Sequence, residues 1–227
     1  MKTAAIVPAL NEGKNIRKVL EVLLVSKHID EVILVDDGSV DDTADIGKDM
    51  GAKVVKLPKK GGSGKGNALK EGLKTTDAEV VVFFDADLIG LTEKHVSSLV
   101  LPVVSGEAVM CVGIRGRLWG MPENIYKIDH LLALGGERAI KKDLLEKIPD
   151  KHIRGFAVET TLNHYCSINN IKVKYILLNR LTHFLKEEKW GLLVGSANRL
   201  KMIWQVVKIR LVILFNKNEF IQKDNTN

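Results

Sequence analysis

Short runs rich in apolar residues alternate with amphipathic segments through the first half of the chain. The runs cover residues 4–7, 31–35, 53–57 and 80–84, and the segment after the first run carries apolar residues at helical spacing from Ile16 to Leu24. Continuous apolar runs of this length are typical of strands that are buried on both faces of a sheet. The alternation of strands with helices predicts a doubly wound α/β fold, in which a mixed, mostly parallel sheet has helices on both faces.

The second half of the chain has a less regular pattern. It predicts a helix over residues 92–104, strands over 109–114 and 171–178, a loop over 115–124 and a helix that begins at Lys141. No internal repeat is visible in either half.

Composition limits the class of protein. The 227 residues carry a formal net charge of +6, which suits anionic partners such as diphosphates or an acidic membrane surface. Aromatic residues make up only 5% of the chain and no recognition motif occurs, so nucleic acid is disfavoured as a partner. Both cysteines, Cys111 and Cys166, stand in apolar stretches, and we expect them to be reduced core residues of a cytoplasmic protein.

Polar residues gather where the predicted strands end. Asp85 and Asp87 directly follow the most apolar run, and Asp37 follows an earlier one. Ligands of doubly wound sheets bind beyond the carboxyl ends of the strands. Buried, unpaired carboxylates are costly, and a divalent cation that also binds a diphosphate removes this cost. The pattern predicts a metal-dependent enzyme for a nucleotide-linked substrate, although such aspartates can also be solvated loop residues or helix N-caps.

Two other phosphate-binding motifs are excluded. The loop at Gly61–Gly66 lacks the anchors of a P-loop, because Gly66 follows Lys65 and Lys59 stands five positions before Gly64. No dinucleotide-binding glycine fingerprint follows the first strand.

Four motifs in order carry a family resemblance. They are Pro-Ala-Leu-Asn-Glu at 8–12, Val-Asp-Asp-Gly-Ser at 35–39 followed by Asp-Asp-Thr at 41–43, Gly-Lys-Gly-Asn-Ala-Leu at 64–69, and Asp-Ala-Asp at 85–87. In this order and spacing the chain resembles the nucleotide-sugar glycosyltransferases of family 2, which have the GT-A fold. The resemblance covers roughly the first ninety residues. Two later segments, 135–139 and 155–159, are similar to glucosyl-3-phosphoglycerate synthases.

The resemblance implies roles for individual residues. The donor, most often UDP-linked in such enzymes, would contact Pro8, Ala9, Leu10, Glu12, Asp37, Gly38, Lys65, Asp85 and Asp87. The metal, Mg²⁺ or Mn²⁺, would be held by Asp87 and His183, and the acceptor by Gly136, Glu137 and Arg138.

Glu159 and Asp87 are the catalytic candidates. Glu159 begins a predicted helix after a glycine-containing segment, and in an inverting transferase it would take the proton of the acceptor hydroxyl. The synthases retain stereochemistry and need no such base, so Glu159 would then bind hydroxyl groups. A glutamate in a first helical turn also simply favours the helix dipole.

The resemblance also implies a domain division. We expect a GT-A domain over residues 1–190, with a donor half at 1–90 and an acceptor half at 91–190, a basic amphipathic helix at 191–217 and a disordered tail at 218–227. The basic helix would lie on the inner face of a membrane, on its own domain or on a second copy of the chain. The acceptor stays open between a polyprenyl phosphate, a glycolipid and a small phosphorylated acid. A sugar-phosphate nucleotidyltransferase is the rival enzyme, but its glycine-rich loop is missing after the first strand.

Overall fold

The computed structural model describes residues 1–58, 62–115, 136–148 and 157–183. Of His183 it describes the backbone alone. The helix predicted at 191–217 and the tail predicted at 218–227 lie outside the described residues, so both stay predictions. Within the described segments, no helix is long and apolar enough to span a bilayer.

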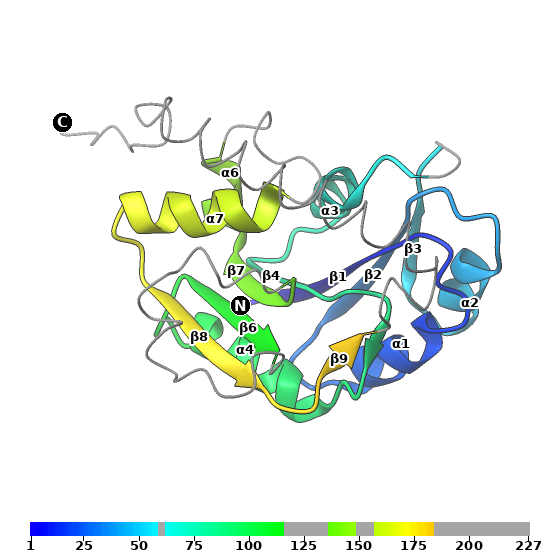
Figure 1. Ribbon diagram of the computed structural model, residues 1–227, viewed down its shortest axis with the longest axis horizontal. Helices are drawn as coiled ribbons and strands as arrows, with labels where there is room; N and C mark the ends of the chain where they lie inside the picture. Colours follow the sequence, from blue (N-terminus) through cyan, green and yellow to red (C-terminus); the bar gives the residue numbers. More distant parts are fainter. Residues whose placement is uncertain (59–61, 116–135, 149–156, 184–227) are drawn as a thin grey trace, which may run out of the picture.

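A seven-stranded sheet forms the centre of the molecule (Figure 1). Its order is β3-β2-β1-β4-β7-β6-β8, and β4 pairs with β1 on one side and β7 on the other. The strands are β1 (Thr3–Ala9), β2 (Glu31–Asp36), β3 (Lys53–Lys56), β4 (Val80–Phe83), β6 (Met110–Arg115), β7 (Arg138–Lys141) and β8 (Val173–Leu178). Within this sheet β7 alone runs antiparallel to its neighbours. The prediction of a mixed, mostly parallel sheet is confirmed.

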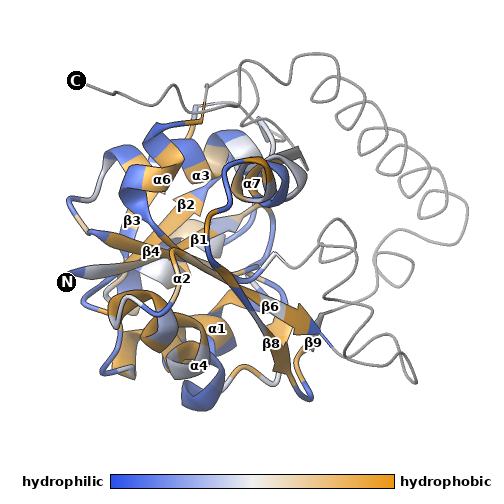
Figure 2. Ribbon diagram, turned by 90° about the vertical axis from the view of Figure 1, so that its left-hand side faces the viewer, coloured by the Kyte–Doolittle hydropathy of each residue, from blue (hydrophilic) through white to orange (hydrophobic). Residues whose placement is uncertain are grey.

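Helices cover both faces of the sheet. On one face lie α1 (Ile16–Val25), α2 (Thr43–Asp49) and α4 (Glu93–Val104), and on the other lie α3 (Lys65–Lys74), α6 (Lys142–Glu146) and α7 (Ala157–Ile168). Figure 2 shows that the strands between the two layers are mostly apolar. All four residues of β4 are buried, as expected for the central strand of a sheet covered on both sides.

Three local predictions differ from the structure. Residues 138–141 form strand β7 rather than leading directly into a helix, and α6 begins one residue later than predicted, at Lys142. The strand Arg-Ala-Ile-Lys has only four residues, two of them charged, so it does not show the alternation of apolar and polar residues that predicts a strand. Strand β6 extends to Arg115, which the sequence placed in a loop.

A second, two-stranded sheet lies beyond the end of β4. Strand β5 (Leu88–Ile89) pairs antiparallel with β9 (Thr182–His183), so that Leu88 stands opposite His183. This pairing brings a segment from the end of the described chain next to the residue that follows Asp87.

Candidate active site

The sheet topology explains why distant polar residues meet. The carboxyl ends of β1, β2, β4 and β6 lie at one edge of the sheet because these strands are parallel to one another. The amino end of β7 lies at the same edge because β7 runs the opposite way. Helices α3 and α7 begin at this edge on one face, so their first-turn residues also reach it.

Asp37 holds the glycine-rich loop against the end of β2. Its carboxylate accepts hydrogen bonds from the backbone N–H groups of Ser63, at 2.8 Å, and Gly64, at 2.8 Å, and from the Ser63 hydroxyl. Carboxylate bonds to backbone N–H groups are among the stronger hydrogen bonds in proteins. Asp37 therefore connects the second of the four motifs to the third.

The first motif lies beside this loop. Pro8 and Ala9 are the last residues of β1, and Leu10 follows them with 36% of its surface exposed. Gly62 has a φ of +91°, and a Cβ there would lie 2.9 Å from Leu10 Cδ2 and 3.1 Å from Asp37 Oδ2. Leu10 and Asp37 thus approach each other across a glycine. An apolar side chain beside a carboxylate suits a planar, hydrogen-bonding ring such as a nucleobase.

Glu12 and Gly38 complete the predicted donor residues at this edge. The Glu12 carboxylate accepts a hydrogen bond from the Asn15 side chain at 2.8 Å, and its backbone N–H donates to Thr43 Oγ1. Gly38 has a φ of +86°, a conformation that glycine adopts without strain.

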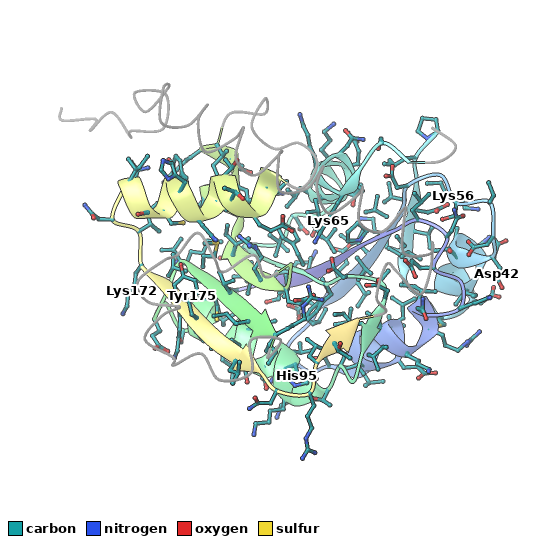
Figure 3. The ribbon with its side chains drawn as sticks, in the orientation of Figure 1. Asp42, Lys56, Lys65, His95, Lys172 and Tyr175 are labelled. Atoms are coloured by element: carbon teal, nitrogen blue, oxygen red, sulfur yellow. The ribbon has the colours of Figure 1, made fainter. Side chains whose placement is uncertain are left out.

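Lys65 joins the third and fourth motifs. Its ammonium lies 2.7 Å from Asp85 Oδ1 and 3.0 Å from Glu159 Oε1 (Figure 3 labels Lys65 between α3 and the sheet). Burial opposes the charge on this ammonium, but the two carboxylates outweigh it and hold the pKa of Lys65 above its ordinary value. The sequence places Glu159 94 positions from Lys65, so this ion pair joins the predicted donor and acceptor halves directly.

Arg115 extends the ion pairs from the other side of Asp85. Its Nη1 lies 3.8 Å from Asp85 Oδ2, and its Nε lies 3.3 Å from Glu137 Oε2. Glu137, Arg115, Asp85, Lys65 and Glu159 thus form a row of five charges that alternate in sign. The row is called the charge row below.

Glu137 and Arg138 are both completely buried. Burial raises the pKa of Glu137 to about 7, and the neighbouring Asp85 adds to the rise. The Arg138 guanidinium lies beneath the start of α7, where its Nη1 donates to Asn163 Oδ1 at 3.3 Å and to the Glu159 carbonyl at 3.5 Å. Their predicted contact with an acceptor stays a prediction.

Gly136 leaves room for the charge row. A Cβ at this position would lie 2.8 Å from Lys65 Nζ and 2.9 Å from Asp85 Oδ2. Any side chain here would therefore displace the ion pair between these two residues.

Asp87 and His183 come from adjacent segments, as the β5–β9 pairing requires. Paired residues of antiparallel strands have Cα atoms about 4.5–5.5 Å apart, so the backbone of His183 lies close to that of Leu88. Among the described side chains, no group of three or more His, Cys, Asp and Glu residues forms a complete metal site. Metal binding by Asp87 and His183 stays a prediction.

Arg115 is the site residue that sequence reasoning missed. The apolar run before it ended at Ile114, and the arginine with its following glycine was typical of a loop. Arg115 could have been identified from its position at the end of a strand that runs parallel to β4. That position can be recognised only when the order of the strands is known.

Comparison with known proteins identifies the family. Residues 4–166 match the model described as Glycosyl transferase family 2, which extends well beyond the first ninety residues that carried the resemblance. The glucosyl-3-phosphoglycerate synthase of Mycobacterium tuberculosis (strain CDC 1551 / Oshkosh) is 39% identical over 118 residues, which cover 48% of this chain and 36% of the relative. The Petrotoga mobilis synthase is 29% identical over 192 residues, or 70% of this chain and 58% of the relative. The alignments thus span roughly a third to three fifths of these curated relatives.

Solved structures agree with this similarity. The M. tuberculosis synthase in complex with Mn²⁺, UDP and glucosyl-3-phosphoglycerate matches with a TM-score of 0.73 and 27% identity, over 93% of this chain and 79% of that one. The same enzyme with Mn²⁺, UDP-glucose and glycerol 3-phosphate matches equally well, with a TM-score of 0.73. Because the family model covers most of the chain, the protein belongs to glycosyltransferase family 2.

Proposed function

We propose that this chain transfers a glucosyl group from UDP-glucose to the hydroxyl of a small phosphorylated acid such as 3-phosphoglycerate, with Mn²⁺ or Mg²⁺ bound at Asp87 and His183. The observation that carries the proposal is the meeting of Lys65, Asp85 and Glu159 at one sheet edge, through contacts of 2.7 and 3.0 Å, next to the loop that Asp37 holds. The synthase structures with UDP or UDP-glucose and Mn²⁺ support the choice of donor and metal.

The first two motifs and the loop would bind the nucleotide. Leu10 offers an apolar contact to the base, and Asp37, which holds the loop amides, offers hydrogen-bond acceptors to it. The Lys65 ammonium has three N–H donors and is buried enough to act in a low dielectric environment, so it would neutralise charge on the donor diphosphate.

The chemical step would take place between Asp85 and Glu159. Asp85 would orient hydroxyl groups of the donor, and Glu159, at the start of α7, would accept a hydrogen bond from the acceptor hydroxyl. A bound divalent cation would stabilise the negative charge of the departing diphosphate. Whether Glu159 also removes the hydroxyl proton depends on the stereochemical outcome, which is inverting or retaining.

Product analysis tests the proposal. The full chain is incubated with UDP-glucose, Mn²⁺ and 3-phosphoglycerate, UDP release is followed, and the anomeric proton of the product is assigned by NMR. A panel of other UDP- and GDP-sugars, and of lipid phosphate acceptors, serves as the comparison. Release of pyrophosphate from UTP and glucose 1-phosphate, without transfer from UDP-glucose, would instead identify a nucleotidyltransferase.

Calorimetry tests the metal assignment separately. Asp87→Ala should abolish the part of UDP affinity that depends on Mn²⁺. Asp77→Ala is the matched control, because Asp77 lies before the opposite end of β4 and pairs with the surface residue Lys2. Metal-dependent UDP binding that survives in Asp87→Ala would reject this assignment.

A further inference from the structure

Glu137 is the unexplained group in the charge row. Its side chain is fully buried, and among the described residues neither carboxylate oxygen has a hydrogen-bond partner. Buried carboxylates normally accept several hydrogen bonds, because leaving them without any is costly. Its ion-pair partner among the described residues is Arg115, at 3.3 Å. A group retained at such a cost calls for a role in the site.

Full burial keeps the Glu137 side chain out of contact with solvent. The residue before it, Gly136, lies directly against Lys65 and Asp85, so Glu137 stands next to the charge row in the chain. The backbone of Glu137 is fixed in the sheet, since its carbonyl accepts a hydrogen bond of 2.8 Å from Gly113. Glu137 is thus placed to act on Arg115 rather than on a substrate.

Arg115 lies between two carboxylates that compete for it. Its Nε is closer to Glu137, at 3.3 Å, than its Nη1 is to Asp85, at 3.8 Å. Asp85 in turn makes its shortest ion pair, at 2.7 Å, with Lys65 on its other side. Without the charge on Glu137, the guanidinium would close on Asp85 and draw it away from Lys65.

We propose that Glu137 is a positioning residue of the donor site: its buried carboxylate holds Arg115 back, so that Asp85 stays paired with Lys65 in the arrangement that binds the nucleotide sugar. This inference rests on the proposed function for the identity of the ligand. The geometric part of it, the coupling of Glu137 to Asp85 through Arg115, concerns the protein without ligand.

Protonation removes the charge of Glu137, so it would also release Arg115 towards Asp85. Its pKa of about 7, raised by burial and by Asp85, means that the carboxylate is charged at pH 8 and largely neutral at pH 6. Arg115 from β6 and Lys65 from α3 face it and oppose the rise. Arg138, next to Glu137 on β7, is also close enough to interact with it.

Glu137→Gln is the central variant, because it keeps the shape of the side chain and removes its charge. We expect the wild-type protein to bind UDP-glucose about tenfold more weakly at pH 6 than at pH 8 in the presence of Mn²⁺. The variant should bind about tenfold more weakly than the wild type at pH 8, whereas at pH 6 the two proteins should bind alike. Glu107→Gln is the control, since Glu107 is an exposed carboxylate paired with Lys174 outside the charge row, and it should behave as the wild type.

Folding does not confound this variant. The pKa of Glu137 in the folded protein, about 7, lies above its ordinary value of 4.5, so protonation favours the folded state as the pH falls through this range. Glu137→Gln should therefore unfold at no lower a urea concentration than the wild type at pH 8.

A double-mutant cycle identifies the route of the effect. In an Arg115→Gln background no guanidinium is left to close on Asp85, so the further change Glu137→Gln should alter donor affinity less than twofold. The proposal is overturned if Glu137→Gln binds UDP-glucose as tightly as the wild type at pH 8. It is also overturned if Glu137→Gln lowers this affinity by the same factor with Arg115 and with Gln at position 115.

Carboxyl ¹³C NMR separates this inference from the proposed function. In the protein without ligand, one carboxyl signal should titrate near pH 7, and this signal should be missing in Glu137→Gln. The chemical shift of the Asp85 carboxyl should change with pH at the same midpoint. If this coupling is present and UDP-glucose does not bind, the proposed function fails and the positioning role of Glu137 stands. If Asp85 does not follow Glu137, the inference fails even where the transferase is active.

Discussion

Gly136→Ala is the sharpest structural test of the site, because one methyl group would enter the space beside the central ion pair. The new Cβ would lie 2.8 Å from Lys65 Nζ and 2.9 Å from Asp85 Oδ2, whereas ordinary contact begins near 3.4 Å. Both charged ends would have to retreat by about half an ångström or more. The backbone of Gly136 lies outside the positive-φ region, so alanine adds no backbone strain.

The cost follows from the geometry of the ion pair. At an effective dielectric constant of about 20, lengthening the Lys65–Asp85 contact from 2.7 Å to about 4 Å loses about 2 kcal/mol of attraction. The side chains keep 19% and 24% of their surface exposed, and solvent screening lowers this figure towards about 1 kcal/mol. A loss of about 1–2 kcal/mol corresponds to donor affinity that is about 5- to 30-fold weaker.

Calorimetry with UDP and Mn²⁺ measures this loss, and urea unfolding measures stability. The weakened ion pair also belongs to the protein without ligand, so Gly136→Ala should lower the free energy of unfolding by no more than about 2 kcal/mol. Gly72→Ala is the matched control on α3, because its Cβ would lie 2.7 Å from Ile6 Cγ2 and 3.0 Å from Val35 Cγ2 in the core. It should lose about 1–3 kcal/mol of stability and keep its donor affinity. Wild-type affinity in Gly136→Ala would refute the role of this ion pair.

Three further predictions concern other parts of the structure. Asp37→Ala should speed hydrogen exchange at the Ser63 and Gly64 amides and weaken UDP binding about tenfold or more, because it removes the acceptor of the loop N–H groups; unchanged exchange would contradict the role of Asp37. His95→Leu should lower the free energy of unfolding by about 1 kcal/mol in urea, since His95 Nε2 donates to the Asn179 carbonyl at 3.0 Å on the face of the sheet opposite Lys65 (Figure 3), and His95→Gln should restore part of this loss. Burial raises the pKa of both cysteine thiols to about 12, so neither should react with a thiol reagent at pH 8 until the protein is unfolded, and rapid reaction of the folded protein would show that a cysteine is accessible.

The sequence was sufficient to predict which residues gather at the ends of β2 and β4. Asp37, Lys65 and Asp85 each follow a strand or open a helix whose pattern is clear, and the rule for parallel sheets places such residues at one edge. Their proximity therefore needed no coordinates. The partners of each charge did need them, because hydrogen bonds such as that from Gly64 to Asp37 depend on the path of a loop.

The other side of the site could not be predicted in the same way. The position of Arg115 in the charge row depends on β6 running parallel to β4 with β7 between them, and nothing in the local sequence encodes this order. Glu137 and Arg138 look like surface residues in the sequence, since charged side chains are almost never fully buried unless they are paired. The ion pair of Glu137 with Arg115 and the hydrogen bond of Arg138 to Asn163 become visible only in the folded chain.

The antiparallel strand β7 also restricts where segments can be exchanged between related proteins. Four ladder pairs, from Val80 with Lys141 to Phe83 with Arg138, join this strand to β4, the middle strand of the seven-stranded sheet. A chimaera that changed parents near residue 90 would combine one parent's β4 with the other parent's β7. The amino-terminal part alone, as an isolated fragment, would leave the apolar edge of β4 open to aggregation. Grafts that seek a new acceptor preference should therefore carry residues 138–141 along with the amino-terminal parent and replace only what surrounds them.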